Sequence, residues 1–167
     1  DHRDLHSFPT RRSSDLGKII LRYMEKAHHV IKLLDPETKE ISNAPLPGIG
    51  SVGRFSARKE KGPYYYSYTS FNSPTTIYRW DDRKNKTIVW EESKSNANTD
   101  GINVQQVEYE SKDGTTVTMF IVHKEGIILD GNNPTFLHGY GGFAIPQTPG
   151  FRSSILPFLE KIGRAHV

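Results

Sequence analysis

The chain has 167 residues, of which 35% are hydrophobic and 25% are charged, and it contains no cysteine. This length can hold one domain or parts of two, and a disulfide framework is excluded. No apolar run approaches the roughly 18 residues that a membrane span needs, so we expect no membrane partner. Because the absence of cysteine favours a reducing compartment, we expect a cytoplasmic protein.

The two ends of the chain lack the pattern of a folded protein. Residues 1–16 have no periodicity and no apolar centre that would make them a signal peptide. Back-translation of residues 6–16 and 161–167 gives sequences that resemble a widely used pair of sequencing adapters in opposite orientations. We therefore interpret 1–16 and 161–167 as adapter-derived, with arbitrary cuts at both ends of the remaining sequence. A native basic tail that binds anions is the alternative.

The formal net charge of +3 comes largely from these two ends. Five of the 22 Lys and Arg residues and three of the 19 Asp and Glu residues lie in them. The sequence between the ends is therefore nearly neutral, and it gives no reason to expect nucleic acid as a partner.

Short strands separated by turns are predicted over the first part of the remaining sequence. We expect strands at residues 17–23, 28–34, 64–70, 75–80 and 87–90, with a Pro- and Gly-rich loop at 44–53. β-branched and aromatic residues support these strands, most clearly in the run YYYSYTS. A spacing of about ten residues between strands is typical of an all-β sandwich or propeller.

The polar segment EESKSNANTD at 91–100 predicts a linker or domain boundary. After it, strands are expected at 104–110 and 117–123, joined by a hairpin turn that contains Asp-Gly. A buried strand is predicted at 134–138, and a helix could begin within 151–160. Strands that give way to a strand, a loop and a helix fit the entry to an α/β domain.

Two sequence patterns are rejected as sites. GIGSVG at 48–53 formally matches G-x-G-x-x-G, but that motif needs a preceding strand and a following helix, and a Pro-rich loop precedes it here. The tyrosine cluster at 64–68 could stack on bases or peptides, although one buried face of a strand explains it better. The chain also contains no G-x-S-x-G nucleophile elbow.

The histidines outside the two ends do not form a metal site, because none has a partner at ligand spacing. They are His28, His29, His123 and His138. We interpret His123, at a strand end, as structural. His138 lies beside a glycine cluster, and a supporting role near a site stays open for it.

The segment Gly139-Tyr140-Gly141-Gly142-Phe143 follows an apolar run and invites two interpretations. It could be a tight turn in which glycines supply positive φ angles. It could also be a strand-end loop that carries an oxyanion donor, with the Tyr140 hydroxyl as the polar group. The residues alone leave both open.

The sequence SKDGTTVTMFIVHKEGIILDGNNPTFLHGYGGF at 111–143 resembles the start of the catalytic domain in the prolyl oligopeptidase family. The segments YYSYTSFNSPTTIYRWD at 65–81 and GSVGRFSARKE at 50–60 resemble the stretches that precede it in that family. One departure is His138, which replaces the first tyrosine of the family pattern Tyr-Gly-Tyr-Gly-Gly-Phe.

The resemblance implies that residues 17–96 are the last blades of a β-propeller and that 97–160 begin an α/β-hydrolase peptidase domain. It implies a monomeric serine endopeptidase that cleaves short peptides on the C-terminal side of proline, with no metal or organic cofactor. The alternative is a non-catalytic relative in which propeller and hydrolase-like domain form a binding scaffold; an unrelated propeller binding module is a third possibility.

The resemblance also assigns roles to single residues. Tyr140 matches the tyrosine whose hydroxyl completes the oxyanion hole, and Phe143 matches an aromatic residue that lines the pocket for the substrate proline. Three glycines would shape the loop: Gly139, Gly141 and Gly142. Because the Ser, Asp and His of the triad are expected beyond Glu160, we expect this chain by itself to be inactive.

Overall fold

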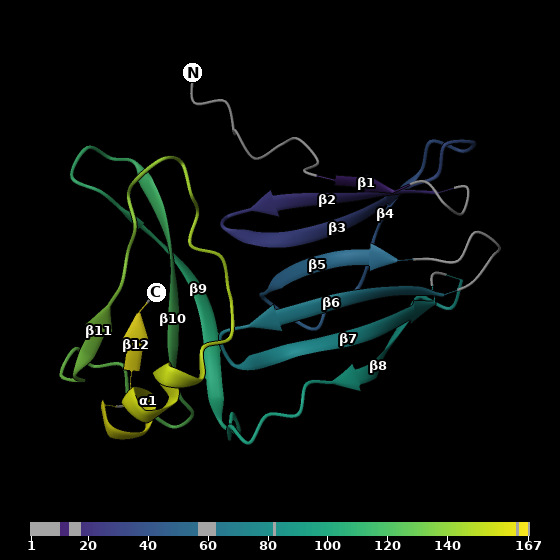
Figure 1. Cartoon of the computed structure of the whole chain (residues 1–167). Helices are drawn as coiled ribbons and strands as arrows, with labels where there is room; N and C mark the ends of the chain where they lie inside the picture. The colour runs from purple at the N-terminus through teal and green to yellow at the C-terminus, as the bar shows by residue number, and fades with distance from the viewer. Residues whose placement is uncertain (1–10, 14–17, 57–62, 82, 163, 167) are drawn as a thin grey trace.

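The computed structural model describes residues 11–13, 18–56, 63–81, 83–162 and 164–166. Over these ranges the chain forms three four-stranded sheets, with a short helix beside the third (Figure 1). Within the described ranges, no helix is long and apolar enough to cross a membrane.

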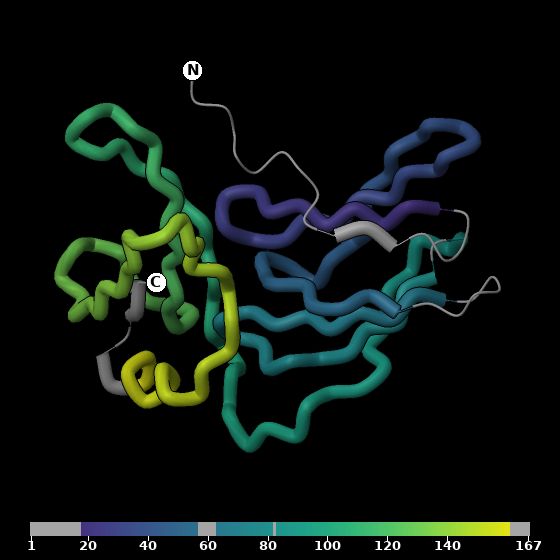
Figure 2. Tube along the Cα trace, turned by 45° about the horizontal axis from the view of Figure 1, so that its top comes forward, coloured from purple at the N-terminus to yellow at the C-terminus, as the bar shows by residue number. Residues whose placement is uncertain are grey.

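The first two sheets are antiparallel, and each follows the order of its strands in the chain. The first contains β1 (Arg11–Ser13), β2 (Ile19–Glu25), β3 (His28–Leu34) and β4 (Ile41–Asn43). The second contains β5 (Ser51–Ser56), β6 (Tyr64–Ser70), β7 (Ser73–Asp81) and β8 (Lys86–Glu92). The two sheets lie one above the other on the same side of the molecule (Figures 1 and 2).

The third sheet is mixed, with strand order β11-β12-β10-β9. Its strands are β9 (Ile102–Glu110), β10 (Thr116–Lys124), β11 (Thr135–Leu137) and β12 (Arg164–His166), and the 3₁₀ turn η1 (Ser153–Ile155) leads into helix α1 (Leu156–Ile162). The β9–β10 hairpin is antiparallel, whereas β11 and β12 are parallel. The strands β1 and β12 fall in the predicted adapter-derived ends. Hydrogen bonds between strands use the backbone and not the side chains. The pairing of β1 and β12 therefore does not test whether these ends are adapter-derived, which stays a prediction.

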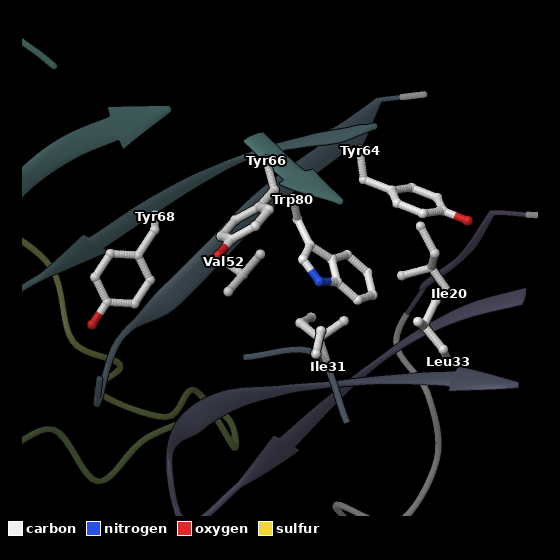
Figure 3. Packing of buried hydrophobic residues seen from close by; sticks show 9 residues of the cluster. Ile20, Ile31, Leu33, Val52, Tyr64, Tyr66, Tyr68 and Trp80 are labelled. Atoms are coloured by element: carbon white, nitrogen blue, oxygen red, sulfur yellow. The ribbon is translucent and has the colours of Figure 1, made fainter. Parts of the chain in front are cut away.

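The core between the first two sheets is built from every second residue of their strands. Residues alternate between buried and half-buried positions along β3 and β6, because successive side chains of a strand point to opposite faces. The buried cluster consists of Ile20, Ile31, Leu33, Ala44, Val52, Tyr64, Tyr66, Tyr68 and Trp80. Figure 3 shows that these side chains fill the space between the sheets, with aromatic groups from the second facing aliphatic groups from the first. The interpretation of the tyrosine cluster as one buried face of a strand is confirmed.

A second apolar cluster joins the second sheet to the third. It consists of Phe71, Ile102, Phe120, Val122, Leu156 and Leu159. Phe71, in the turn after β6, contacts Phe120 of β10 with ring centroids 5.3 Å apart. In the same turn, the Asn72 side-chain amide donates a hydrogen bond of 2.8 Å to the Ile102 carbonyl. The segment after the predicted linker is therefore packed against the second sheet.

Two sequence-based expectations were wrong, and one strand was missed. Residues 51–53 belong to β5 rather than to a loop. This strand has a bulge and pairs with the tyrosine-rich β6, so it forms without a regular alternation of apolar residues in its own sequence. The short strand β4 was not expected at all. The predicted buried strand at 134–138 is instead the three-residue β11, and all three of its residues are exposed.

Candidate oxyanion loop

The glycine-rich segment follows β11 and lies on the surface. The Tyr140 side chain is 50% exposed, and the Phe143 side chain is 91% exposed. A phenylalanine ring that stays in water lacks the hydrophobic stabilisation of a few kcal/mol that burial would give it. Single apolar side chains are common on protein surfaces, so this exposure leaves the ring free for a contact without showing one.

The backbone turns sharply immediately after the glycines. The Ile145 N–H donates a hydrogen bond of 3.2 Å to the Gly142 carbonyl. The two central residues of this turn, Phe143 and Ala144, have φ angles of 55° and 52°. This is the left-handed conformation that glycine or asparagine normally supplies, so each residue stores backbone strain.

The positive φ angles therefore fall on Phe143 and Ala144, and not on the three glycines before them. The sequence interpretation that the glycines supply positive φ was wrong. Ala144 was missed as a residue that shapes the loop, since nothing in its local sequence marks it as left-handed.

Among the three glycines, Gly142 has a steric role. A Cβ atom on Gly142 would lie 3.1 Å from the Tyr140 hydroxyl oxygen and 3.3 Å from the ring carbon that carries it. A Cβ on Gly139 or Gly141 would meet no atom within 4 Å. The absent side chain of Gly142 thus lets the Tyr140 ring fold back over the turn.

Two hollows border this loop. One, of about 580 Å³, is lined by Tyr140 and Ile145 of the loop, by Met119 of β10, and by Ala27 at the tip of the β2–β3 hairpin. The other, of about 260 Å³, is lined by three phenylalanine rings, by Arg152 and by several smaller polar residues. His138 lines both hollows, which places this residue next to the candidate site.

The segment after the loop is anchored to the second sheet. The Ser51 hydroxyl donates a hydrogen bond of 2.6 Å to the Pro149 carbonyl. Two residues further on, the Phe151 N–H donates one of 3.2 Å to the Thr69 hydroxyl. The candidate loop therefore lies between β11 on one side and a fixed contact with β5 and β6 on the other.

His123 has the structural role that its position predicts. It is buried, its Nδ1 lies 2.8 Å from the Lys124 carbonyl, and its Nε2 lies 3.1 Å from the Gln105 side-chain nitrogen. The carbonyl can only accept, so Nδ1 carries the proton and Nε2 accepts from Gln105. Within the described ranges, no group of three or more His, Asp or Glu side chains could hold a metal ion.

Comparison with known proteins identifies the domain to which the two stacked antiparallel sheets belong. Residues 9–93 match the profile of the prolyl oligopeptidase N-terminal β-propeller domain, which is half of the chain. The chain belongs to the prolyl oligopeptidase family, and the first two sheets are part of its β-propeller. The family resemblance seen in the sequence is confirmed.

Related proteins agree with this assignment. A prolyl endopeptidase of Elizabethkingia miricola is 37% identical over 145 residues, which are 87% of this chain and 21% of that protein. A solved prolyl endopeptidase, one of two studied for inter-domain dynamics in catalysis and specificity, superposes with a TM-score of 0.81 at 34% identity. The superposition covers 99% of this chain and 24% of that structure.

A third relative was solved with a peptide. Prolyl oligopeptidase B from Galerina marginata, bound to a 25mer macrocyclization substrate, superposes with a TM-score of 0.78 at 25% identity, over 95% of this chain and 23% of that one. This chain therefore spans about a fifth to a quarter of the length of the relatives that it matches.

Proposed function

We propose that this chain is a segment of a longer serine endopeptidase that cleaves short peptides on the C-terminal side of proline. In this proposal, residues 17–96 are propeller blades and residues 97–160 begin an α/β-hydrolase domain. The family membership and the exposed Tyr140 hydroxyl beside a hollow support the proposal. The ends 1–16 and 161–167 are adapter-derived, and the longer protein acts as a monomer in the cytoplasm.

In this mechanism, Tyr140 donates its hydroxyl proton in a hydrogen bond to the oxyanion that forms when the nucleophile attacks the scissile carbonyl. A donor aimed at this oxygen stabilises the transition state more than the substrate, because negative charge develops there only during the reaction. The ring position over Gly142 supports the assignment, since it keeps the hydroxyl near the turn. Glycine at 142 is the residue that permits this arrangement.

Phe143 would form part of the pocket for the substrate proline. A flat aromatic face packs well on a pyrrolidine ring, and the contact removes apolar surface of both groups from water. The exposure of the Phe143 ring supports this role, because no described part of the chain covers it. Gly139 and Gly141 would leave the backbone free to present both side chains.

The serine, aspartate and histidine of a triad would come from sequence beyond residue 160. In the triad the histidine accepts the serine proton, and the serine oxygen then forms the acyl bond to the substrate. His28, His29, His123 and His138 take no part in this chemistry. We therefore expect residues 17–160 alone to have no peptidase activity.

The experiment is to extend the source transcript beyond residue 160, express the full-length protein, and compare two fluorogenic peptides that differ only in proline or alanine before the scissile bond. We expect cleavage of the proline peptide and covalent labelling of one serine by a fluorophosphonate. Labelling without cleavage of the proline peptide would contradict the proline specificity. An open reading frame without a G-x-S-x-G serine would favour the non-catalytic scaffold.

A further inference from the structure

In the part of the chain that the structure describes, no strand pairs with the outer edge of β5, and side chains of the first sheet take the place of one. The Val52 N–H donates a hydrogen bond of 2.7 Å to Nδ1 of His29. The Val52 carbonyl accepts one of 2.7 Å from Nη1 of Arg22. The backbone N–H of His29 completes the contact with a bond of 3.0 Å to the Gly50 carbonyl.

These bonds occupy both polar backbone groups of one buried residue. Val52 has 0% of its surface exposed, and His29 has 9%. In an antiparallel pair, the N–H and C=O of one residue point to the same side. The N–H and the C=O of Val52 both point toward the first sheet, so their hydrogen bonds come from His29 and Arg22. A buried N–H or C=O without a partner is destabilising, because it has lost its hydrogen bonds to water.

The bond to Val52 requires a neutral His29. Nδ1 accepts the Val52 proton, so a neutral ring must carry its own proton on Nε2. A protonated ring would direct an N–H at the Val52 N–H, and the hydrogen bond would be replaced by a repulsion between two donors. Nδ1 is therefore an acceptor in one charge state and a donor in the other.

The charged and titratable surroundings of His29 disfavour its protonation. Arg22 reaches across from β2, and His28 is the neighbour of His29 on β3. On the other side of the contact lie backbone groups of Gly50, just before β5, and of Val52 and Gly53 in β5. Burial lowers the pKa of His29 from 6.5 to about 4, and the positive charges of Arg22 and His28 act in the same direction. His29 is thus neutral at neutral pH.

We propose that His29 and Arg22 form an acid-sensitive clamp that holds β5 of one propeller sheet on the hairpin of the preceding sheet, and that mild acid weakens it. In the open state the ring is solvated and takes up a proton at its ordinary pKa of 6.5. Between pH 6.5 and about 4, the open state binds a proton that the closed state does not. The closed state is therefore destabilised as the pH falls through this range.

The clamp is connected to the candidate loop by adjacent residues. Ser51, the first residue of β5, lies between Gly50 and Val52, and its hydroxyl donates a hydrogen bond to the Pro149 carbonyl. Release of the Val52 edge would therefore also loosen the anchor of the segment that follows the loop. The clamp itself does not depend on any peptidase activity of the longer protein.

The test is amide hydrogen exchange of the full 167-residue chain, measured by NMR between pH 8 and pH 5 and corrected for intrinsic exchange. From pKa values of about 4 and 6.5, the opening constant at Val52 should increase about 30-fold over this range. The Phe151 amide should lose protection in parallel. A Val52 protection factor that stays constant would overturn the proposal.

Two variants separate the clamp from a general effect of acid. His29→Asn keeps an acceptor oxygen near Nδ1 but does not titrate, so its Val52 protection should be independent of pH. His28→Gln removes the neighbouring histidine, which is the smallest of the three influences on His29, and should keep most of the 30-fold change. A direct titration of the His29 ring nitrogens in the wild-type chain is the second measurement. A ring that titrates near 6.5 in the folded chain, or a His29→Asn variant as pH-sensitive as wild type, would contradict the clamp.

Discussion

Aromatic residues are buried in the first two sheets and exposed in the segment at 135–147. In the sheets, Tyr66 and Trp80 are 1% exposed, and the Tyr64 and Trp80 rings lie 5.1 Å apart. In the segment, Phe143 is almost fully exposed and sits on strained backbone. The buried rings stabilise the fold, whereas an exposed ring on a strained turn contributes little to it. Substitutions should therefore affect stability in one region and function in the other.

The largest expected effect is on the buried core. Trp80→Ala should lower the free energy of unfolding by about 3–5 kcal/mol, because it leaves a large cavity between the first two sheets. Urea denaturation of the chain measures this change. The matched control is Trp90→Ala on β8, where the side chain is 58% exposed and contacts Tyr65 at the edge. Equal losses for the two variants would contradict the placement of Trp80 in the core.

The next effect concerns the exposed region and should appear in the catalytic rate. In the full-length protein, Tyr140→Phe should lower kcat about 100- to 1000-fold, as expected for the loss of one oxyanion donor, with KM nearly unchanged. The free energy of unfolding should change by less than about 0.5 kcal/mol. Tyr109→Phe is the control, because Tyr109 lines the same hollow and is 49% exposed. An unchanged kcat in Tyr140→Phe would remove this hydroxyl from the mechanism.

Alkaline pH should act selectively on the buried aromatic region. Burial raises the pKa of Tyr66 and of Tyr68 from 10 to about 12. The unfolded state loses these protons above pH 10, while the folded state keeps them until about pH 12. Stability should therefore be complete below pH 10 and should fall as the pH rises from 10 to 12, by on the order of 2 kcal/mol for each tyrosine.

Urea denaturation at pH 9, 10 and 11 checks this expectation. The double variant Tyr66→Phe with Tyr68→Phe should show a smaller loss between these pH values than wild type. Tyr109→Phe, which changes an exposed hydroxyl, should behave like wild type. Identical pH slopes for the double variant and wild type would show that the two buried tyrosines do not contribute.

The smallest effect is expected at the polar contact between the first and third sheets. Lys26 at the β2–β3 hairpin tip pairs with Glu108 of β9 at 2.9 Å, and their side chains are 58% and 41% exposed. Because water and salt screen exposed pairs, Glu108→Gln should cost only about 0.2–1 kcal/mol, and less at high salt. Denaturation at 0.05 M and 1 M salt measures this. A loss above about 2 kcal/mol, or one that is the same at both salt concentrations, would contradict the expectation that solvent screens this pair.

The sequence by itself determined most strands of the first two sheets and the β9–β10 hairpin. The strands β3 and β6 match the predicted ranges 28–34 and 64–70 because their alternating side chains and flanking turns are local signals. The family was also readable from the sequence, because the segments at 50–60, 65–81 and 111–143 carry its pattern.

Only the tertiary structure decided the features that depend on residues far apart in the chain. Val52 is 23 residues from His29, and Ser51 is 98 residues from Pro149, so no sequence pattern predicts these hydrogen bonds. The same holds for β5, which is stabilised as a strand by its neighbours rather than by its own sequence. The strain at Ala144 likewise arises from how the loop closes, because alanine has no intrinsic preference for positive φ.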